Sequence, residues 1–336
     1  MILTWIGLMF WFFMFFKEVS RKSALVHSTP AAIIHNCFIF RQLIRDIVQA
    51  LQPGRNEEMK HQRLRRRVYT VKGPNHMWHA DGYDKLKPYG LCIHACIDGF
   101  SRRLIWLEVS RSNKNPALIC NYFLSSVQDL SMVPRVVRLD HGTENVHVIT
   151  CQRMLREVHE DSLVQVSVML GSSNHNQRIE RFWSYLRTSL IQDYMNIFKD
   201  YLSTGVIDFS KPTHVECVAF CFLPVLRSEL KALFNTWNTS HEIRQMKNSG
   251  CPSGVPQTLF EHPQIHNAEE QGLLAEDEIL RRCQEHYSVH NVVDVDPAFE
   301  AWALQVMIES NLALPHDIDQ ACKLFTKLIC KIYESE

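Results

Sequence analysis

The sequence lacks the short motifs by which several large enzyme classes are recognised. It has neither the Gly-x-x-x-x-Gly-Lys-Ser/Thr loop that holds nucleotide phosphates nor the Gly-x-Ser-x-Gly turn that presents a nucleophilic serine. It also has no internal repeat and no low-complexity tract. Any chemistry carried by this chain therefore has to come from side chains that are far apart in the sequence.

The chain also lacks a disulfide or zinc framework, although it contains 11 cysteines. They are spread from Cys37 to Cys330, and no two of them form a Cys-x-x-Cys pair. In a chain of 336 residues this distribution is typical of reduced, mostly buried thiols in a cytosolic or nuclear protein.

Net charge is absent overall but not locally, since 36 basic residues balance 36 acidic ones. Residues 17–73 carry twelve Lys or Arg against four Asp or Glu, a net charge of +8. Residues 261–336 carry five against fifteen, a net charge of −10. The chain is 46% hydrophobic and 21% charged, so it can bury a sizeable core, and a disordered or collagen-like chain is excluded.

The first sixteen residues, 1–16, form an apolar run interrupted only by Thr4 and Gly7. A membrane-spanning helix needs about 20 residues, and the run has neither the basic start nor the small-residue cleavage site of a secretion signal. Two interpretations stay open, a mispredicted start of the coding sequence and a weak membrane anchor. We expect a nuclear protein that is not held at a membrane.

The rest of the chain divides into a basic helical arm over 17–75, a central region over 76–262 and an acidic helical tail over 263–336. In the central region, turn residues separate segments with the periodicities of strands and helices. Strands are expected at 77–83, 91–97, 104–109 and 135–139, with an apolar run at 163–170. Helices are expected from Pro116, over 146–158, from His175, and over 215–237 with a kink or break at Pro224. Strands followed by alternating helices and strands predict an α/β mixed sheet with helices packed on it.

Three carboxylates occupy positions where the expected structure exposes them. Asp81 lies within the first strand, Asp140 ends the fourth, and Glu180 borders the apolar face of the helix that starts near His175. In the sequence, 58 and then 39 residues separate them. Carboxylates so placed can hold two divalent cations about 4 Å apart, which activates a hydroxyl for attack on a phosphodiester. By spacing alone, three surface charges are the favoured interpretation, because the chain has 36 acidic residues.

The sequences around these carboxylates narrow the choice. Trp78–Gly82 (WHADG), Ile97–Arg102 (IDGFSR), Asp140–Asn145 (DHGTEN) and His175–Trp183 (HNQRIERFW) follow one another in the order of a known set of motifs. Residues 76–260 thereby resemble the catalytic core of retroviral and retrotransposon integrases and of related acidic-triad transposases. Within that group the motifs most resemble integrase-core proteins encoded in animal genomes, which look like captured mobile elements.

The resemblance implies a ribonuclease-H-like fold, an α/β mixed five-stranded sheet flanked by helices, here with helical N- and C-terminal extensions. It implies that Asp81, Asp140 and Glu180 are catalytic and bind two Mg²⁺ or Mn²⁺ ions for DNA strand transfer. The expected partners are DNA and further copies of the chain, without a small-molecule cofactor. Two alternatives stay open, a domesticated nucleic-acid-binding protein without turnover and a nuclease of the same fold.

The chain departs from retroviral integrases in two places. Their N-terminal His-His-Cys-Cys zinc module has only partial counterparts here, in His27, His35 and Cys37, so no zinc is expected. The C-terminal region is acidic, which argues against DNA binding there. In the motifs themselves, Asp98 begins a turn and is expected to accept backbone hydrogen bonds instead of binding metal.

Nucleic-acid contacts are expected at two places in the chain. One is the arginine run of the basic arm, and the other is the start of the Glu180 helix. The residues are Arg63, Arg65, Arg66, Arg67, Asn176, Gln177 and Arg178. The net charge of the arm favours contacts with phosphates, although a solvated helix face is the alternative for the arginine run.

Replacing the four arginines of the arm by Gln should weaken non-specific DNA binding and flatten its salt dependence. For each phosphate that is no longer bound, the slope of log K against log salt should fall by about 0.9, because fewer counterions are released. Fluorescence anisotropy with duplex DNA at several salt concentrations measures the slope. An unchanged slope would leave the arginines as a solvated helix face.

Overall fold

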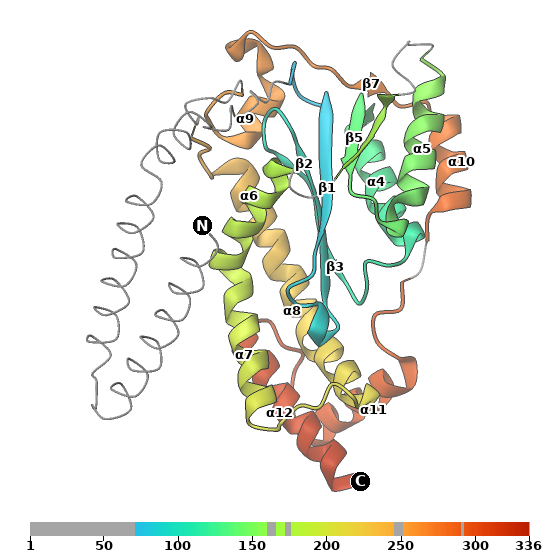
Figure 1. Ribbon diagram of the computed structural model, residues 1–336. Helices are drawn as coiled ribbons and strands as arrows, with labels where there is room; N and C mark the ends of the chain where they lie inside the picture. The colour runs from blue at the N-terminus through green and yellow to red at the C-terminus, as the bar shows by residue number, and fades with distance from the viewer. Residues whose placement is uncertain (1–70, 160–165, 172–175, 245–250, 290–291, 336) are drawn as a thin grey trace, which may run out of the picture. The chain divides into compact units, whose positions relative to one another are not determined.

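The computed structural model describes residues 71–159, 166–171, 176–244, 251–289 and 292–335 (Figure 1). The apolar segment, nearly all of the basic arm and its four arginines lie outside these ranges. Residues 68–336 form one compact unit, and the structure below is that of this unit. In the described residues, no helix is both long and apolar enough to cross a membrane.

A five-stranded mixed sheet lies at the centre of the unit, as the sequence predicts (Figure 1). Its order is β3-β2-β1-β5-β6, with β1–β2 and β2–β3 antiparallel and β1–β5 and β5–β6 parallel. The strands are β1 (Met77–Tyr83), β2 (Cys92–Asp98), β3 (Leu104–Ser110), β5 (Val136–Leu139) and β6 (Val168–Leu170). The first three match the predicted strands to within one residue, because tight turns separate them clearly in the sequence.

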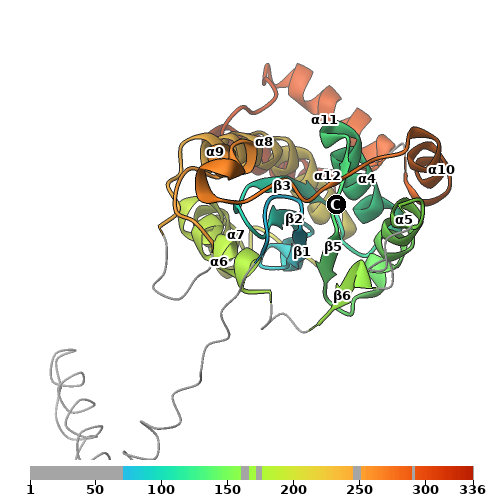
Figure 2. The same ribbon diagram turned by 90° about the horizontal axis from the view of Figure 1, so that it is seen from above.

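Helices cover both faces of the sheet, and the strands alternate between two cores (Figure 2). On one face pack α4 (Pro116–Leu130), α5 (Val146–Glu157) and α10 (Asp277–Tyr287). On the other pack α6 (Gln177–Leu186), α7 (Gln192–Ser203) and α8 (Pro212–Thr239). In β1, Trp78 and Ala80 enter the first core and Tyr83 the second, as the two-residue period of a strand requires.

The long helix predicted from His175 is divided in the structure. Helix α6 ends at Leu186, a π-helical turn spans Arg187–Ile191, and α7 follows. At Pro224 a break of the helix is absent, because α8 runs through the proline as one helix of 28 residues. Buried neighbours such as Phe222 and Leu226 hold the helix between the sheet and the C-terminal helices. This packing offsets the loss of one backbone hydrogen bond at the proline.

The acidic C-terminal region does not form a separate unit beyond 262. Short β7 (Leu273–Leu274) pairs with β4 (Met132–Val133), and α10 inserts Leu280 and Cys283 into the core with α4 and α5. The remaining elements are α9 (Pro256–Glu261), α11 (Pro297–Glu309), α12 (Ile318–Ser335) and the 3₁₀ turns Lys87–Tyr89, Thr143–Asn145 and Pro263–His266. Helices α11 and α12 bury apolar side chains against α8. The acidic residues of α10, α11 and α12 are exposed, so they lie on the outer sides of helices whose inner sides belong to the core.

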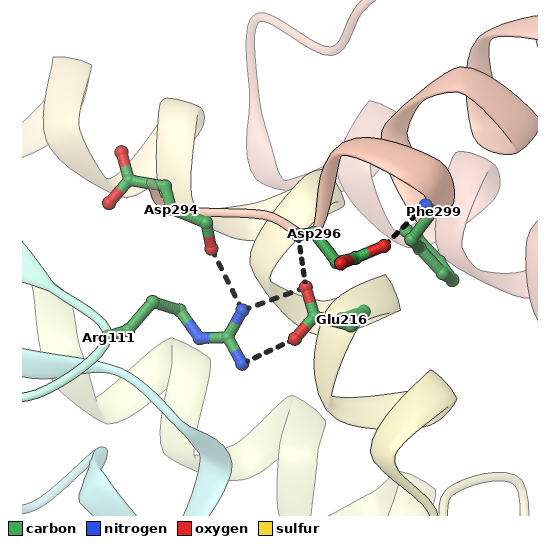
Figure 3. Close-up of polar contacts among 5 residues, drawn as sticks. All are labelled: Arg111, Glu216, Asp294, Asp296 and Phe299. Atoms are coloured by element: carbon green, nitrogen blue, oxygen red, sulfur yellow. Dashed lines mark hydrogen bonds and ion pairs between the residues drawn. The ribbon is translucent and has the colours of Figure 1, made fainter. Parts of the chain in front are cut away.

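An ion pair fixes the segment that leads into α11 (Figure 3). The Arg111 guanidinium donates to both carboxylate oxygens of Glu216 at 2.9 and 3.1 Å and to the backbone carbonyl of Asp294 at 2.8 Å. Glu216 also accepts from the backbone N–H of Asp296 at 2.9 Å. The Asp296 carboxylate in turn caps α11 by accepting from the N–H groups of Ala298 and Phe299. One bidentate pair thus links the end of β3, α8 and the start of α11.

Replacing Glu216 by Ala should lower the free energy of unfolding by about 2 kcal/mol. The change leaves the half-buried Arg111 guanidinium without its carboxylate and frees the N–H of Asp296. Urea unfolding measures the loss. As the control, Arg281→Ala removes exposed pairs with Glu278 and Glu285 and should cost clearly less. Equal losses in the two variants would contradict the role of this ion pair.

Candidate active site

The side chain of Asp81 faces α6 from the central strand of the sheet. Alternation along β1 puts His79, Asp81 and Tyr83 on the same face. Each of the three contacts a residue of the α6 segment: His79 the amide of Asn176, Asp81 the indole of Trp183, and Tyr83 the ring of Trp183. The carboxylate of Asp81, in the middle of β1, thus lies where the strand meets α6 and belongs to neither apolar core.

Each oxygen of the Asp81 carboxylate accepts one hydrogen bond. Oδ1 accepts from the backbone N–H of Gly82 at 3.0 Å and Oδ2 from the indole N–H of Trp183 at 3.2 Å. Burial, together with the negative charges of Asp140 and Glu180, raises the pKa of Asp81 to about 6, against the opposing effect of these two bonds. The three predicted carboxylates therefore lie close enough to act on one another electrostatically.

Asp140 directly follows β5, the parallel neighbour of β1. The register pairs His79 with Arg138, and two further residues along both strands put Asp140 beside Asp81. The Asp140 Oδ1 accepts from the backbone N–H of Gly142 at 3.1 Å and from the amide of Asn145 at 2.7 Å. The turn after the strand therefore holds this carboxylate at the carboxyl end of the sheet, where open α/β sheets bind ligands.

Glu180 lies on α6, which buries the side chains of Ile179, Phe182, Trp183 and Leu186. Glu180 itself is exposed next to that buried face, as the helical spacing predicts. Its charge reaches Asp81, on which it acts together with Asp140. Two strands and one helix thus bring together carboxylates that have 58 and 39 residues between them in the sequence.

The donor set is chemically suited to divalent cations that prefer oxygen ligands. In the described ranges, none of the three carboxylates forms an ion pair with a Lys or Arg, and burial together with the charges of Asp140 and Glu180 raises the pKa of Asp81. Hard cations such as Mg²⁺ favour carboxylates of this kind. The three carboxylates do not surround one ion position, because among the described residues no group of three or more His, Cys, Asp or Glu is close enough to hold one ion.

The residues predicted to touch nucleic acid at the start of α6 have different surroundings. Gln177 is exposed, and Arg178 is half-buried, with its guanidinium 3.1 Å from the Sγ of Cys251. Asn176 is only 4% exposed. Its Nδ2 donates to the backbone carbonyl of Ala80 at 3.3 Å, and its Oδ1 lies 2.6 Å from the Nδ1 of His79. Its amide therefore makes polar contacts between α6 and β1, and the contact of Asn176 with nucleic acid stays a prediction.

The prediction for Asp98 is confirmed. Its Oδ2 accepts from the backbone N–H groups of Phe100 and Ser101 and from the Ser101 hydroxyl, and its Oδ1 accepts from the N–H of Asn75. The side chain is fully buried, and these bonds stabilise the turn between β2 and β3. Asp98 is therefore a turn residue and is not part of the carboxylate group of the site.

Sequence reasoning missed the polar role of Trp183. The helical period places it correctly on the buried face of α6, but such a pattern treats tryptophan as an apolar residue. The one usable signal is that a buried indole N–H needs an acceptor. A single sequence cannot show that the acceptor is Asp81, which lies 102 positions away.

Comparison with known proteins gives one match to a family. The model of the integrase core domain matches residues 68–272. This range contains all five strands of the central sheet, helices α4 to α9 and the three carboxylates. No curated protein matches the chain.

Replacing Asp81 by Asn should stabilise the metal-free protein at pH 7.5. The pKa of Asp81 is about 6 in the folded protein against 3.8 in a free side chain. The folded state thus holds the proton more tightly, and wild-type stability falls as the pH rises from about 4 to about 6. Asn is uncharged and of similar shape, so the variant should gain about 2–3 kcal/mol at pH 7.5 and nothing at pH 4.

Urea unfolding in EDTA at the two pH values measures this gain. As the control, Asp84→Asn removes an exposed ion pair with Lys87 and should give no gain at pH 7.5. A gain of equal size at pH 4 would mean that the carboxylate of Asp81 is not the cause.

Proposed function

Because the chain belongs to the integrase core family, we propose that it transfers DNA strands by phosphodiester transesterification. The observation that carries the proposal is the approach of Asp140 and Glu180 to Asp81 at the sheet, where their charges add to the effect of burial in raising the pKa of Asp81. Carboxylates held close together repel one another and destabilise the fold, and such groups with a shifted pKa are typical of functional sites. The nucleophile is the 3′-hydroxyl of a DNA end or a water molecule, so no nucleophilic side chain is needed.

Each carboxylate has a role that follows from its position. Asp81, with both oxygens in hydrogen bonds, is the most rigidly oriented of the three. Asp140 is held by the turn that ends in Asn145, and Glu180 extends from α6. We assign all three as ligands of two Mg²⁺ or Mn²⁺ ions, which when bound would activate the attacking hydroxyl and stabilise the leaving oxygen.

DNA is the proposed substrate, and positively charged side chains near the site can bind its phosphates. Gln177 and Arg178 lie at the start of α6, one turn before Glu180. Burial and the charges of Arg138 on β5 and of Arg178 lower the pKa of the His79 imidazole, so two positive charges lie near β1. Further affinity comes from the four arginines of the basic arm. Joining two DNA ends requires more than one active site, so we propose a homo-oligomer that acts in the nucleus.

A domesticated nucleic-acid-binding protein is the second candidate, and one observation favours it. In the part of the chain that the structure describes, the carboxylates do not converge on a single ion position. A protein that keeps the fold for binding alone has no need of that convergence. A nuclease of the same fold uses the same carboxylates and differs only in its product, because water replaces the 3′-hydroxyl.

A strand-transfer assay with the full chain tests the proposal. Labelled duplex ends should be joined to a second duplex in Mg²⁺ or Mn²⁺ but not in Ca²⁺, whose larger size and flexible coordination suit the geometry poorly. Asp140→Asn should reduce the rate at least about 100-fold, because removing a ligand costs more than the 10–100-fold typical of removing a group that only orients a ligand. Asp84→Asn is the matched control and should keep the wild-type rate.

The products separate the three candidates. Joined strands support the integrase, and cut but unjoined strands identify the nuclease. DNA that is bound tightly and left intact in both metals, with Asp140→Asn binding as well as wild type, would establish the protein without turnover.

A further inference from the structure

The indole of Trp183 makes a hydrogen bond unlike those of the other buried tryptophans. The indole N–H groups of Trp78, Trp106 and Trp237 donate to the Asn75 amide, the His94 imidazole and the backbone carbonyl of Arg102. None of these three acceptors is a carboxylate of the candidate active site. Trp183 donates to the Oδ2 of Asp81, a carboxylate of the candidate active site.

The ring of Trp183 is itself held firmly. It is 5% exposed, and its centroid lies 5.0 Å from that of Tyr83 on β1 and 5.4 Å from that of Phe182 on α6. An indole packed on two sides cannot rotate away without opening the core. Its N–H therefore points in a fixed direction before any ligand arrives.

The choice of donor matters for the charge of the site. A Lys or Arg at this place would neutralise Asp81 and compete with a divalent cation for its charge. The indole N–H is neutral, so it orients the carboxylate and leaves the charge in place. With the Gly82 N–H on Oδ1, the two donors fix the plane of the carboxylate through both oxygens and leave each oxygen a further lone pair.

The same helix carries Glu180, three residues before Trp183. The bond to Asp81 therefore also sets the position of α6 along β1. At the start of the helix Asn176 does the same, because its side chain is bonded to His79 and to the carbonyl of Ala80 and does not cap its own helix. Two polar contacts, one on each side of Glu180, thus register the helix on the strand.

We propose that Trp183 is a positioning residue that holds the carboxylate of Asp81 in the orientation in which it binds a divalent cation. It acts through Asp81 and touches neither cation nor DNA. The proposal rests on the proposed function, because it takes Asp81 to be a metal ligand. It adds a residue that also couples the strand of Asp81 to the helix of Glu180.

The indole resonance of Trp183 provides a direct test in the full-length wild-type protein. The protein is labelled with ¹⁵N at its tryptophan indoles and titrated with Mg²⁺, while calorimetry follows the binding of the ion. Cation binding at Asp81 should shift the Trp183 N–H signal, which is assigned in the wild type by its nuclear Overhauser contacts with the ring of Tyr83. The Trp237 signal should stay in place, since its acceptor is the carbonyl of Arg102.

The variants give the second measurement. Trp183→Phe keeps an aromatic ring against Tyr83 and removes the N–H, so it should weaken Mn²⁺ binding about tenfold or more, as measured by electron paramagnetic resonance. Trp237→Phe also loses a buried indole hydrogen bond, but one to a backbone carbonyl, and should bind Mn²⁺ like wild type. If Trp183→Phe does not fold, the wild-type titration alone decides.

Four results would overturn the proposal. Mg²⁺ binding without a shift of the Trp183 signal, or unchanged Mn²⁺ affinity in folded Trp183→Phe, would remove the positioning role and leave the proposed function intact. Equal weakening by both Phe variants would reduce Trp183 to a packing residue. A wild-type protein that binds no divalent cation would overturn the metal-dependent function and this proposal together.

Discussion

The packing of α6 on the odd-numbered face of β1 is the constraint on which the candidate site depends. His79, Asp81 and Tyr83 share that face because strand side chains alternate, and each of them meets the segment from Asn176 to Trp183. A shift of β1 by one residue would turn Asp81 into the core formed with α4 and α5. The pairings of β1 with β2 and β5 exclude that shift, so the sheet register decides which way the carboxylate points.

The two cores supply the rigidity that this arrangement needs. Trp78 packs edge-on against Trp106 and Phe123 on one side of β1, while Tyr83 packs against Trp183 on the other. The C-terminal helices extend both cores, with α10 on the first and α11 and α12 on the second. Their burial helps to offset the free energy lost by holding three carboxylates near one another.

The range matched by the integrase core domain contains the three carboxylates but not the C-terminal helices. The matched range ends at 272, whereas the compact unit continues to 336. The helices beyond the matched range are joined to it by apolar packing and by the pair between Arg111 and Glu216. The C-terminal region therefore contributes to the stability of the core while its charge is unsuited to DNA, so the proposed nucleic-acid contacts fall on the opposite, basic end of the sequence and around α6.

The sequence by itself determined the elements with strong local patterns. Tight turns set the first three strands, the helical period set the buried face of α6, and the Asp-Gly turn chemistry set the bonds of Asp98. The motifs around Asp81, Asp140 and Glu180 sufficed to name the family. Local signals of this kind act over a few residues, and one sequence displays them directly.

Only the tertiary structure decided the properties that depend on distant partners. Pro224 lies inside a continuous helix because packing on both sides of α8 outweighs the absence of one hydrogen bond. The amide of Asn176 is bonded to β1, because strand and helix meet there. For the same reason Trp183 is the donor to Asp81. Hydrogen bonds between residues about 100 positions apart leave no trace in local periodicity, since they arise only when the sheet register and the helix packing are both in place.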